Sequence, residues 1–368
     1  IPASFDEVAR NLTIQASQKA GLPRVMLIEE PQAAFYAWID RHRSDWEERV
    51  QPGQKILVCD VGGGTTDFTL IRVKSGADDK VLFHRVAVGD HLILGGDNLD
   101  LALAYFIEGR FREEGVAQLT PRQWSVLVRV ARQVKEALLS SDAPDQFTVS
   151  LPGAGSKLIG DSLQTQVTKQ QVTDVLLEGF LPQTKFTDRP QSNQSGFREF
   201  GLPYAADSAV TRYLADFLRT HAETAAENTM LSDDANAARP DIVLFNGGLF
   251  ESQLLKQRMT DVVSSWFSEG DAKWQPLILN CERLDLAVAQ GAACYGMVSR
   301  GIGVRISAGL PRTYYLGVET ETGMNAVCLV PAGTEPGTDL DPPEQTFQLQ
   351  TGRPVEFPVL YSGTRLTD

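Results

Sequence analysis

The chain has 368 residues, of which 42% are hydrophobic and 22% charged, and its formal net charge is −13 at pH 7. This composition is typical of a globular protein with two or three domains. Acidic residues are spread along the whole chain, so most of its surface repels a nucleic-acid backbone, and the sequence excludes nucleic-acid binding.

The first fifty residues are predicted to form a helix, a strand and a second helix. Ser4 and Glu7 make a capping-box pattern at the start of the first helix, and Gly21 ends it. The apolar run 25–28 predicts a short strand. Pro31 suits the first turn of the second helix, because its fixed φ matches the helix and its missing N–H has no partner there.

The segment 55–73, KILVCDVGGGTTDFTLIRV, has two β-rich runs separated by glycines and threonines. This pattern predicts a strand, a tight turn and a strand. The run 81–89 predicts a third strand. Helices are predicted to dominate 97–140, the second of them opened by Thr120 and Pro121.

The second half of the chain alternates predicted loops with regular elements. Segments 183–204 and 232–240 are rich in turn residues, so we expect loops there, with a helix from Asp207 towards Ala226 between them. A buried strand is predicted at 241–245, followed by Asn246-Gly247-Gly248 and a helix through Trp266. An alanine-rich helix is predicted at 285–298.

Beyond Gly303 the composition shifts to valine, threonine, tyrosine, glycine and proline. This shift predicts a separate all-β piece. Its candidate strands are Tyr314 to Glu319, Ala326 to Val330, Gln345 to Leu349 and Val355 to Leu360.

Cysteine usage and hydropathy bear on the compartment. The four cysteines lie far apart without a C-x-x-C pair, which fits neither a disulfide framework nor a zinc site and favours a reducing cytoplasm. No run approaches the ~20 apolar residues that cross a bilayer, so we expect no membrane partner.

The glycine turn between the first two sheet strands is the strongest candidate for chemistry. Asp60 ends one strand, Asp67 begins the next, and Gly62, Gly63 and Gly64 leave the backbone amides open to a phosphate. The two carboxylates suit a hydrated Mg²⁺ that also meets nucleotide phosphates. A plain glycine-rich hairpin with two solvated aspartates is the alternative. The turn is neither a P-loop nor a Rossmann turn.

The motif DVGGGTTD resembles the second phosphate loop of DnaK-type chaperones, the 70-kDa heat-shock family within the actin and sugar-kinase superfamily. The resemblance identifies the chain as a divergent, bacterial-type member truncated at its N-terminus. It runs from residue 1 to about 300 and, more loosely, to 368. Further motifs resemble family segments in the same order: IPASFDEVARNLTIQASQKAG, IEEPQAA, LGGDNLD, DIVLFNGG and DLAVAQGAA.

The resemblance implies an α/β fold, in which an actin-like, ribonuclease H-like ATPase lobe with a helical subdomain precedes a small all-β segment. The implied parts are a remnant of ATPase lobe I at 1–50, lobe II at 51–303, and the start of a β-sandwich peptide-binding domain at 304–368. Lobe II would consist of subdomain IIA, 51–96 and 240–303, and the helical subdomain IIB, 97–239.

The resemblance also implies roles for individual residues. Asp60, Asp67 and Glu30 would be catalytic, the two aspartates holding Mg²⁺ through water, and Pro2 and Arg10 would report the nucleotide state to the peptide-binding domain. Each of Pro2, Arg10 and Glu30 also fits an ordinary structural role. ATP or ADP would be contacted by Gly62, Gly63, Gly64, Thr65, Thr66, Gly95, Gly96, Lys135, Gly247, Gly248 and Asp285.

The adenosine side departs from the family pattern. Arg132 stands where the family has a glutamate, and Glu136 stands where it has a base. After the second glycine pair, Glu251 replaces the arginine that stacks on adenine. Phe250 offers either a substitute stacking surface or a core residue.

Two further departures concern activity and coupling. The family's first phosphate loop and catalytic lysine lie upstream of the segment that matches Ile1, so we expect this fragment to bind nucleotide weakly and to be inactive. The acidic, leucine-rich linker of the family is replaced by GVRISAGLPRTYYLGVE, so coupling between lobe and β-domain differs.

Three functions follow for the intact protein. The first is a chaperone that binds and hydrolyses ATP to control its binding of unfolded or extended peptide clients. Its partners would be a J-domain co-chaperone and a nucleotide exchange factor. The second is a pseudo-ATPase scaffold that holds nucleotide or a partner without turnover. The third, a small-molecule kinase or phosphatase, is disfavoured by the β-rich stretch 314–360.

Overall fold

The computed structural model of the chain describes most of its length. No helix in the described part is both long and apolar enough to cross a bilayer. Of the predicted features, Ser4, the strand 345–349, residues 192–204 of the loop 183–204 and residues 232–237 of the loop 232–240 lie outside the described residues. The described residues are 1–3, 5, 7–75, 81–90, 92–116, 118–153, 162–191, 205–222, 238–268, 273–304, 306–307, 310, 313–320, 323–331, 334, 338–341, 352 and 357–362.

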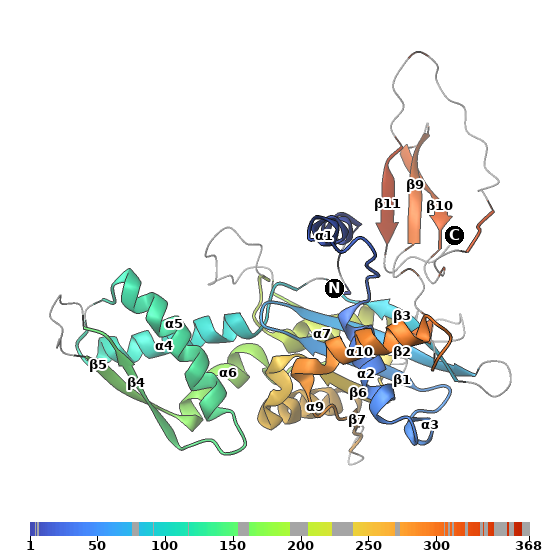
Figure 1. Ribbon diagram of the computed structural model, residues 1–368. Coiled ribbons are helices and arrows are strands. Elements are labelled where there is room, and N and C mark those ends of the chain that lie inside the picture. The colour runs from blue at the N-terminus through green and yellow to red at the C-terminus, as the bar shows by residue number, and fades with distance from the viewer. Residues whose placement is uncertain are drawn as a thin grey trace.

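A six-stranded sheet forms the centre of the molecule, in the order β7-β6-β1-β2-β3-β8 (Figure 1). The first three strands form an antiparallel meander, whereas β6 joins β1, and β8 joins β3, in parallel. The predicted strand, turn, strand and third strand are confirmed. The strands are β1 Lys55–Val61, β2 Thr66–Ser75, β3 Val81–Val88, β6 Ile242–Asn246, β7 Leu277–Leu279 and β8 Ile306–Ser307.

Helices cover both faces of this sheet, which is why β1 is buried from Ile56 onward instead of alternating with polar residues. Leu57 and Cys59 pack into the core shared with α7 and α9, while Ile56 and Val58 pack into the core shared with α2 and α10. These helices are α2 Glu30–Arg41, α7 Val210–Thr220, α9 Gln253–Phe267 and α10 Leu284–Val298.

A helical subdomain lies at one end of the molecule, beyond the sheet (Figure 1). The threonine hydroxyls of Thr120 and Thr168 cap α5 and α6, each in a capping box with a glutamine three residues on. The predicted helices of 97–140 are confirmed; the sequence interpretation had not found the hairpin and helix that follow. The subdomain comprises α4 Gly96–Glu113, α5 Pro121–Leu138, β4 Gln146–Leu151, β5 Leu163–Thr168 and α6 Lys169–Phe180.

A separate three-stranded sheet follows β8, in the order β10-β9-β11. It consists of β9 Thr313–Thr320, β10 Gly323–Val330 and β11 Val359–Ser362. The predicted all-β piece is therefore confirmed, although its last described strand begins four residues later than the sequence indicated. The fold is α/β with a helical subdomain and a small β segment, as expected.

The N-terminal segment contains one wrong prediction. Helix α1, Glu7–Lys19, forms as expected, followed by Gly21 at a φ of 83°. The run 25–28 forms no strand, because no described strand lies beside it. At the end of this run, the amino group of Ile1 donates a hydrogen bond to the carbonyl of Ile28 at 2.9 Å. Val25 and Met26 remain exposed.

Helix α10 packs on α2 with the two backbones nearly in contact. A Cβ at Gly291 would lie 1.7 Å from the carbonyl oxygen of Ala33, whereas a Cβ at Gly296, five residues on in the same helix, meets nothing within 4 Å. Only glycine fits the first position. This contact fixes α2, and with it Glu30, over the sheet.

We expect Gly291→Ala to lower the free energy of unfolding by about 3 kcal/mol, because the added methyl forces the two helices apart. Gly296→Ala is the matched control and should raise it by about 1 kcal/mol through helix propensity. Urea unfolding of both variants checks this. Equal stability changes would show that the helices do not pack as described.

Candidate nucleotide-binding site

The glycine turn joins two strands whose carboxylates face each other. Asp60 and Asp67 are directly opposed across the β1–β2 pair. Gly62 donates its N–H to the carbonyl of Thr65 at 2.9 Å, which closes the turn. The turn therefore holds both predicted catalytic aspartates at one end of the sheet.

The N-terminus of α4 packs directly on this turn. Gly96 and Asp97 donate their N–H groups to the carbonyls of Gly62 and Gly63 at 2.9 and 2.7 Å. A Cβ at Gly95 would lie 2.7 Å from the Gly63 carbonyl oxygen, so the approach depends on glycine. The arrangement places backbone amides and the positive end of a helix dipole together, which suits a phosphate.

Thr66 supports the turn from the inside. Its side chain is fully buried, and its hydroxyl donates to the carbonyl of Leu94 at 2.7 Å. Its N–H donates to the carbonyl of Leu92 at 3.0 Å. Of the two threonines predicted to contact nucleotide, Thr66 is thus committed to the protein, while Thr65 lies in the turn itself.

Asp60 is the most perturbed acid of the site. Burial raises its pKa to about 7, and the charges of Glu30 and Asp67 raise it further, while a hydrogen bond from Asn246 opposes the shift. The Asn246 amide donates to Asp60 at 2.9 Å, and its own oxygen lacks a partner among the described residues. Three acidic side chains that destabilise one another's charge favour a bound cation.

The residues fit a hydrated Mg²⁺. Among the described residues, no three acidic, histidine or cysteine side chains converge as a ready-made metal cage. Mg²⁺ commonly keeps several waters and takes only one or two carboxylates. Asp60 and Asp67, with Glu30 near Asp60, are therefore the residues that would hold it, through water.

A cavity of about 600 Å³ opens beside the turn. The predicted site residues that do not line it are Glu30, Asp60, Asp67, Gly64, Thr65, Thr66, Gly95 and Gly247. The cavity brings together six of the predicted residues from five parts of the chain: Gly62, Gly63, Gly96, Lys135, Gly248 and Asp285.

Lys135 forms the positive wall of the cavity. Its Nζ lies 2.6 Å from Asp100 and donates to the carbonyl of Gly96 at 3.1 Å. Burial raises the pKa of Asp100, and the hydrogen bond from Lys135 opposes the rise. Sequence reasoning missed Asp100, although it is the last residue of the LGGDNLD motif.

The mouth of the cavity carries the unusual charges noted in the sequence. Arg132 pairs with Glu136 at 3.1 Å, and Arg283 with Asp285 at 2.7 Å, both pairs largely exposed. Glu251 also lines the cavity.

Two residues beside the cavity are structural. Phe250 is fully buried and packs on Phe245 with ring centres 4.5 Å apart, so it belongs to the core and does not stack on a ligand. Gly247 has a φ of 88°, and a Cβ there would lie 2.2 Å from the carbonyl oxygen of Val61. Gly247 thus lets β6 and the glycine turn meet.

The predicted switch residues lie near the N-terminal end of α2. Arg10 pairs with Glu29 at 2.6 Å, and Arg85 of β3 pairs with the second oxygen of the same carboxylate. Burial, followed by the charge of Arg10, lowers the pKa of Arg85 to about 10. Among the described residues, no hydrogen bond joins Pro2 directly to Arg10. The carbonyl of Pro2 accepts a hydrogen bond from the N–H of Phe5. Sequence reasoning missed Glu29 and Arg85.

Comparison with known proteins agrees with this geometry. The family model described as Hsp70 protein matches residues 1–186. A chaperone protein HscA homolog of Acinetobacter baumannii is 33% identical over 143 residues, 39% of this chain and 21% of the relative. The HscA homolog of Acidovorax sp. is 35% identical over 154 residues, 42% and 22%. That of Histophilus somni is 35% identical over 144 residues, 39% and 20%. The matched segment spans about a fifth of each relative's length.

We expect Asp60→Asn to stabilise the chain at pH 8. The folded pKa of about 7 lies above the ordinary 3.8, so the acid's contribution to stability is lost as pH rises from about 4 to 7. The amide removes this loss, on the order of 3 kcal/mol, and can donate to the unpartnered oxygen of Asn246.

The measurement is the difference in unfolding free energy between variant and wild type at pH 5 and pH 8. Asp145→Asn, an exposed position just before β4, serves as the control and should show a constant difference. A pH-independent difference for Asp60→Asn would mean that Asp60 titrates normally.

Proposed function

The chain belongs to the Hsp70 family, and on that premise we propose that it is the nucleotide-controlled part of a molecular chaperone. Its fold is the actin-like ATPase α/β fold with a helical subdomain and a small β segment. In the intact protein, binding and hydrolysis of ATP control the binding of unfolded or extended peptide segments. J-domain co-chaperones and nucleotide exchange factors are its proposed partners.

One observation carries the nucleotide assignment: the glycine turn, the N-terminus of α4 and Lys135 meet at one cavity beside two opposed, buried carboxylates. The turn amides and the helix dipole bind the terminal phosphates, and Lys135 supplies a positive charge. Mg²⁺, held through water by Asp60 and Asp67, would neutralise charge that develops on the phosphates.

Asp60 contributes a second chemical property. With a pKa of about 7, its carboxylate accepts a proton near neutral pH, which suits a base that orients and deprotonates a water molecule. Burial is the main cause of this raised pKa, and the charge of Glu30 adds to it. We therefore assign Asp60, Asp67 and Glu30 to hydrolysis.

The proposed domain division follows the sheets. The peptide-binding role of the last part is supported by the exposed apolar side chains Phe357, Val359 and Tyr361 on and beside β11. A cytoplasmic location is supported by four free cysteines. The proposed parts are 1–50 from lobe I, 51–303 as lobe II and 304–368 as the start of the peptide-binding domain.

A pseudo-ATPase is the second candidate, and the cavity mouth favours it. The exposed pairs Arg132–Glu136 and Arg283–Asp285 neutralise the guanidinium groups that could otherwise stack on a base. Such a protein holds nucleotide or a partner without turnover. We also propose that the activity is of the DnaK type rather than that of the HscA homologues.

We expect Gly64→Ala to weaken binding of MgADP to the chain roughly tenfold, because a methyl on the turn keeps phosphate from the amides. The fold should be unchanged, since a Cβ at Gly64 meets nothing within 4 Å. Gly109→Ala, equally open but in the middle of α4, should leave affinity unchanged. Isothermal titration calorimetry measures both, and equal affinities would exclude phosphate binding by the turn.

Single-turnover hydrolysis of ATP by the full-length protein separates the two candidates. The chaperone ATPase predicts that wild type hydrolyses bound ATP and that Asp67→Asn binds it without hydrolysis. Binding without hydrolysis in both proteins would establish the pseudo-ATPase. Absence of any nucleotide binding would overturn both.

A further inference from the structure

A second cavity, of about 460 Å³, lies beside β2 and α7 of the central sheet. It shares no lining residue with the nucleotide cavity. Its floor is Phe68 of β2, one wall is α7 with Phe217 and His221, and Tyr361 of β11 closes it from the separate β sheet. A ligand here touches the lobe and the β segment together.

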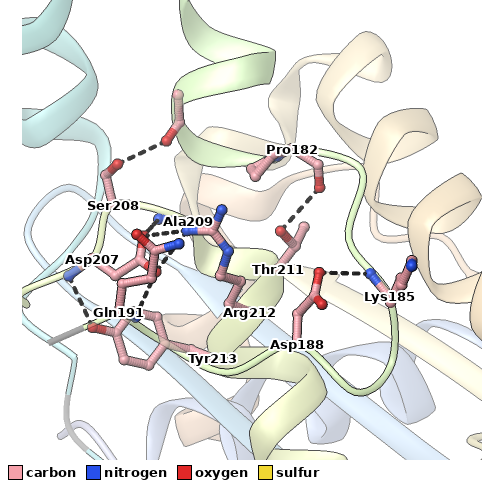
Figure 2. Close-up of polar contacts among 11 residues, drawn as sticks. Pro182, Lys185, Asp188, Gln191, Asp207, Ser208, Ala209, Thr211, Arg212 and Tyr213 are labelled. Atoms are coloured by element: carbon pink, nitrogen blue, oxygen red, sulfur yellow. Dashed lines mark hydrogen bonds and ion pairs between the residues drawn. The ribbon is translucent and has the colours of Figure 1, made fainter. Parts of the chain in front are cut away.

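One wall of this cavity is held rigid by Asp207, as Figure 2 shows. The Asp207 carboxylate accepts hydrogen bonds from the N–H groups of Ala209 and Gln191, both at 2.9 Å, and from Arg212 at 2.8 Å. The Asp207 N–H donates to the Tyr213 hydroxyl at 3.3 Å. Burial opposes ionisation of Asp207, but these hydrogen bonds lower its pKa.

The consequence of that network is a cavity wall formed before any ligand arrives. Gln191 follows Pro190, and both Pro190 and Tyr213 line the cavity. Asp207 is buried and therefore braces these two side chains from behind. Pre-organised walls of this kind are typical of binding sites, because little ordering free energy is lost when the ligand enters.

The charges around the cavity are all of one sign. Asp90 and Asp216 line it, and none of the described lysines or arginines does. Asp216 also pairs with Arg219 of the same helix, so Asp90 at the exposed rim is the less engaged carboxylate. Together with the rings of Tyr213 and Phe217, the carboxylates attract a cation and repel an anion.

His221 supplies a second, independent indication of a ligand. It is only 6% exposed, and its Nδ1 has no hydrogen-bond partner among the described residues. Its ring packs on Phe217 with centres 5.0 Å apart. Burial lowers its pKa, against a smaller opposite effect of Asp90, so the imidazole is neutral at pH 7 and its Nδ1 can accept a hydrogen bond. A buried acceptor without a donor costs free energy that a bound donor recovers.

We propose that this cavity binds a guanidinium or ammonium group carried on an apolar stem, as in an arginine or lysine side chain. The cation meets Asp90 and Asp216 at the rim, one of its N–H groups donates to Nδ1 of His221, and the stem packs on Phe217 and Leu92. The site is separate from nucleotide binding and does not depend on it. Because Tyr361 and Ser362 complete the site, its occupation stabilises the contact between lobe and β sheet.

The probe is the peptide acetyl-Leu-Arg-Leu-amide, with the citrulline peptide, which has the same shape but no charge, as its control. We expect the arginine peptide to bind the 368-residue chain and the citrulline peptide to bind roughly tenfold more weakly, because charge-assisted hydrogen bonds are lost. Titration calorimetry measures both. Equal binding of the two peptides, or binding of neither at millimolar concentration, overturns the proposal.

Variants locate the binding. His221→Phe keeps the ring packing on Phe217 but removes the acceptor, and Asp90→Asn removes a rim charge; each should weaken the arginine peptide roughly fivefold. Asp145→Asn, a distant exposed carboxylate, should not. Because His221 is buried, the melting temperature of each variant is compared with wild type. A folded Asp90→Asn that binds normally contradicts the site, even if His221→Phe fails to fold.

Two further readouts distinguish the source of the cation and the role of His221. N-acetyl-arginine amide binding as tightly as the peptide assigns the site to a small cationic molecule, whereas much tighter binding of the peptide assigns it to a side chain of a protein segment. The Nδ1 nitrogen of His221 should change its ¹⁵N chemical shift when arginine peptide is added. An unchanged shift while the peptide is bound means that the peptide binds elsewhere.

Discussion

The whole site depends on backbones that approach more closely than any side chain would allow. Gly95 brings the start of α4 against the glycine turn, and Gly247 brings the end of β6 against Val61. At both places a Cβ would overlap backbone atoms. Strand ends and a helix end thus converge where only glycine fits, and Gly62, Gly63, Gly96 and Gly248 line one cavity. A phosphate site built from backbone needs this convergence first and specific side chains second.

The carboxylates at this point are held in an unfavourable electrostatic state. Asp60 and Asp67 are buried opposite each other, and the only side-chain hydrogen bond shown to Asp60 among the described residues comes from the neutral Asn246. The fold therefore holds two acids together at some cost in stability, which a bound cation would offset. Lys135 is treated differently, since Asp100 neutralises it within the wall of the cavity. The positive charge of Lys135 is thus neutralised within the protein, whereas the carboxylates of Asp60 and Asp67 are available to bind a metal ion.

The sequence predicted what depends on local pattern and missed what depends on distant partners. The hairpin of β1 and β2, the capped helix α5 and the all-β piece follow from alternation, capping residues and composition, and all are confirmed. The run 25–28 failed because a strand needs a neighbour, and its apolar residues alone do not supply one.

Contacts between side chains that lie far apart in the sequence could not be predicted either. Asn246 reaches Asp60 over 186 positions, and Glu29 joins residues of α1 and β3. Arg132 and Glu136 were noted as departures, but their pairing needed the helix geometry to show it. Phe250 illustrates the converse, since an aromatic beside a motif suggested stacking, whereas the cluster with Phe245 places it in the core.

Strand β2 connects the opposed carboxylates to the second cavity. Successive residues of a strand point to opposite faces, so Asp67 faces Asp60 on one side of the sheet while Phe68 forms the floor of the second cavity on the other. The connection repeats one residue earlier, where Thr66 donates its N–H to the carbonyl of Leu92, which also lines the second cavity. The second cavity therefore shares a strand with the carboxylate pair, although its proposed binding of a cation does not require a nucleotide.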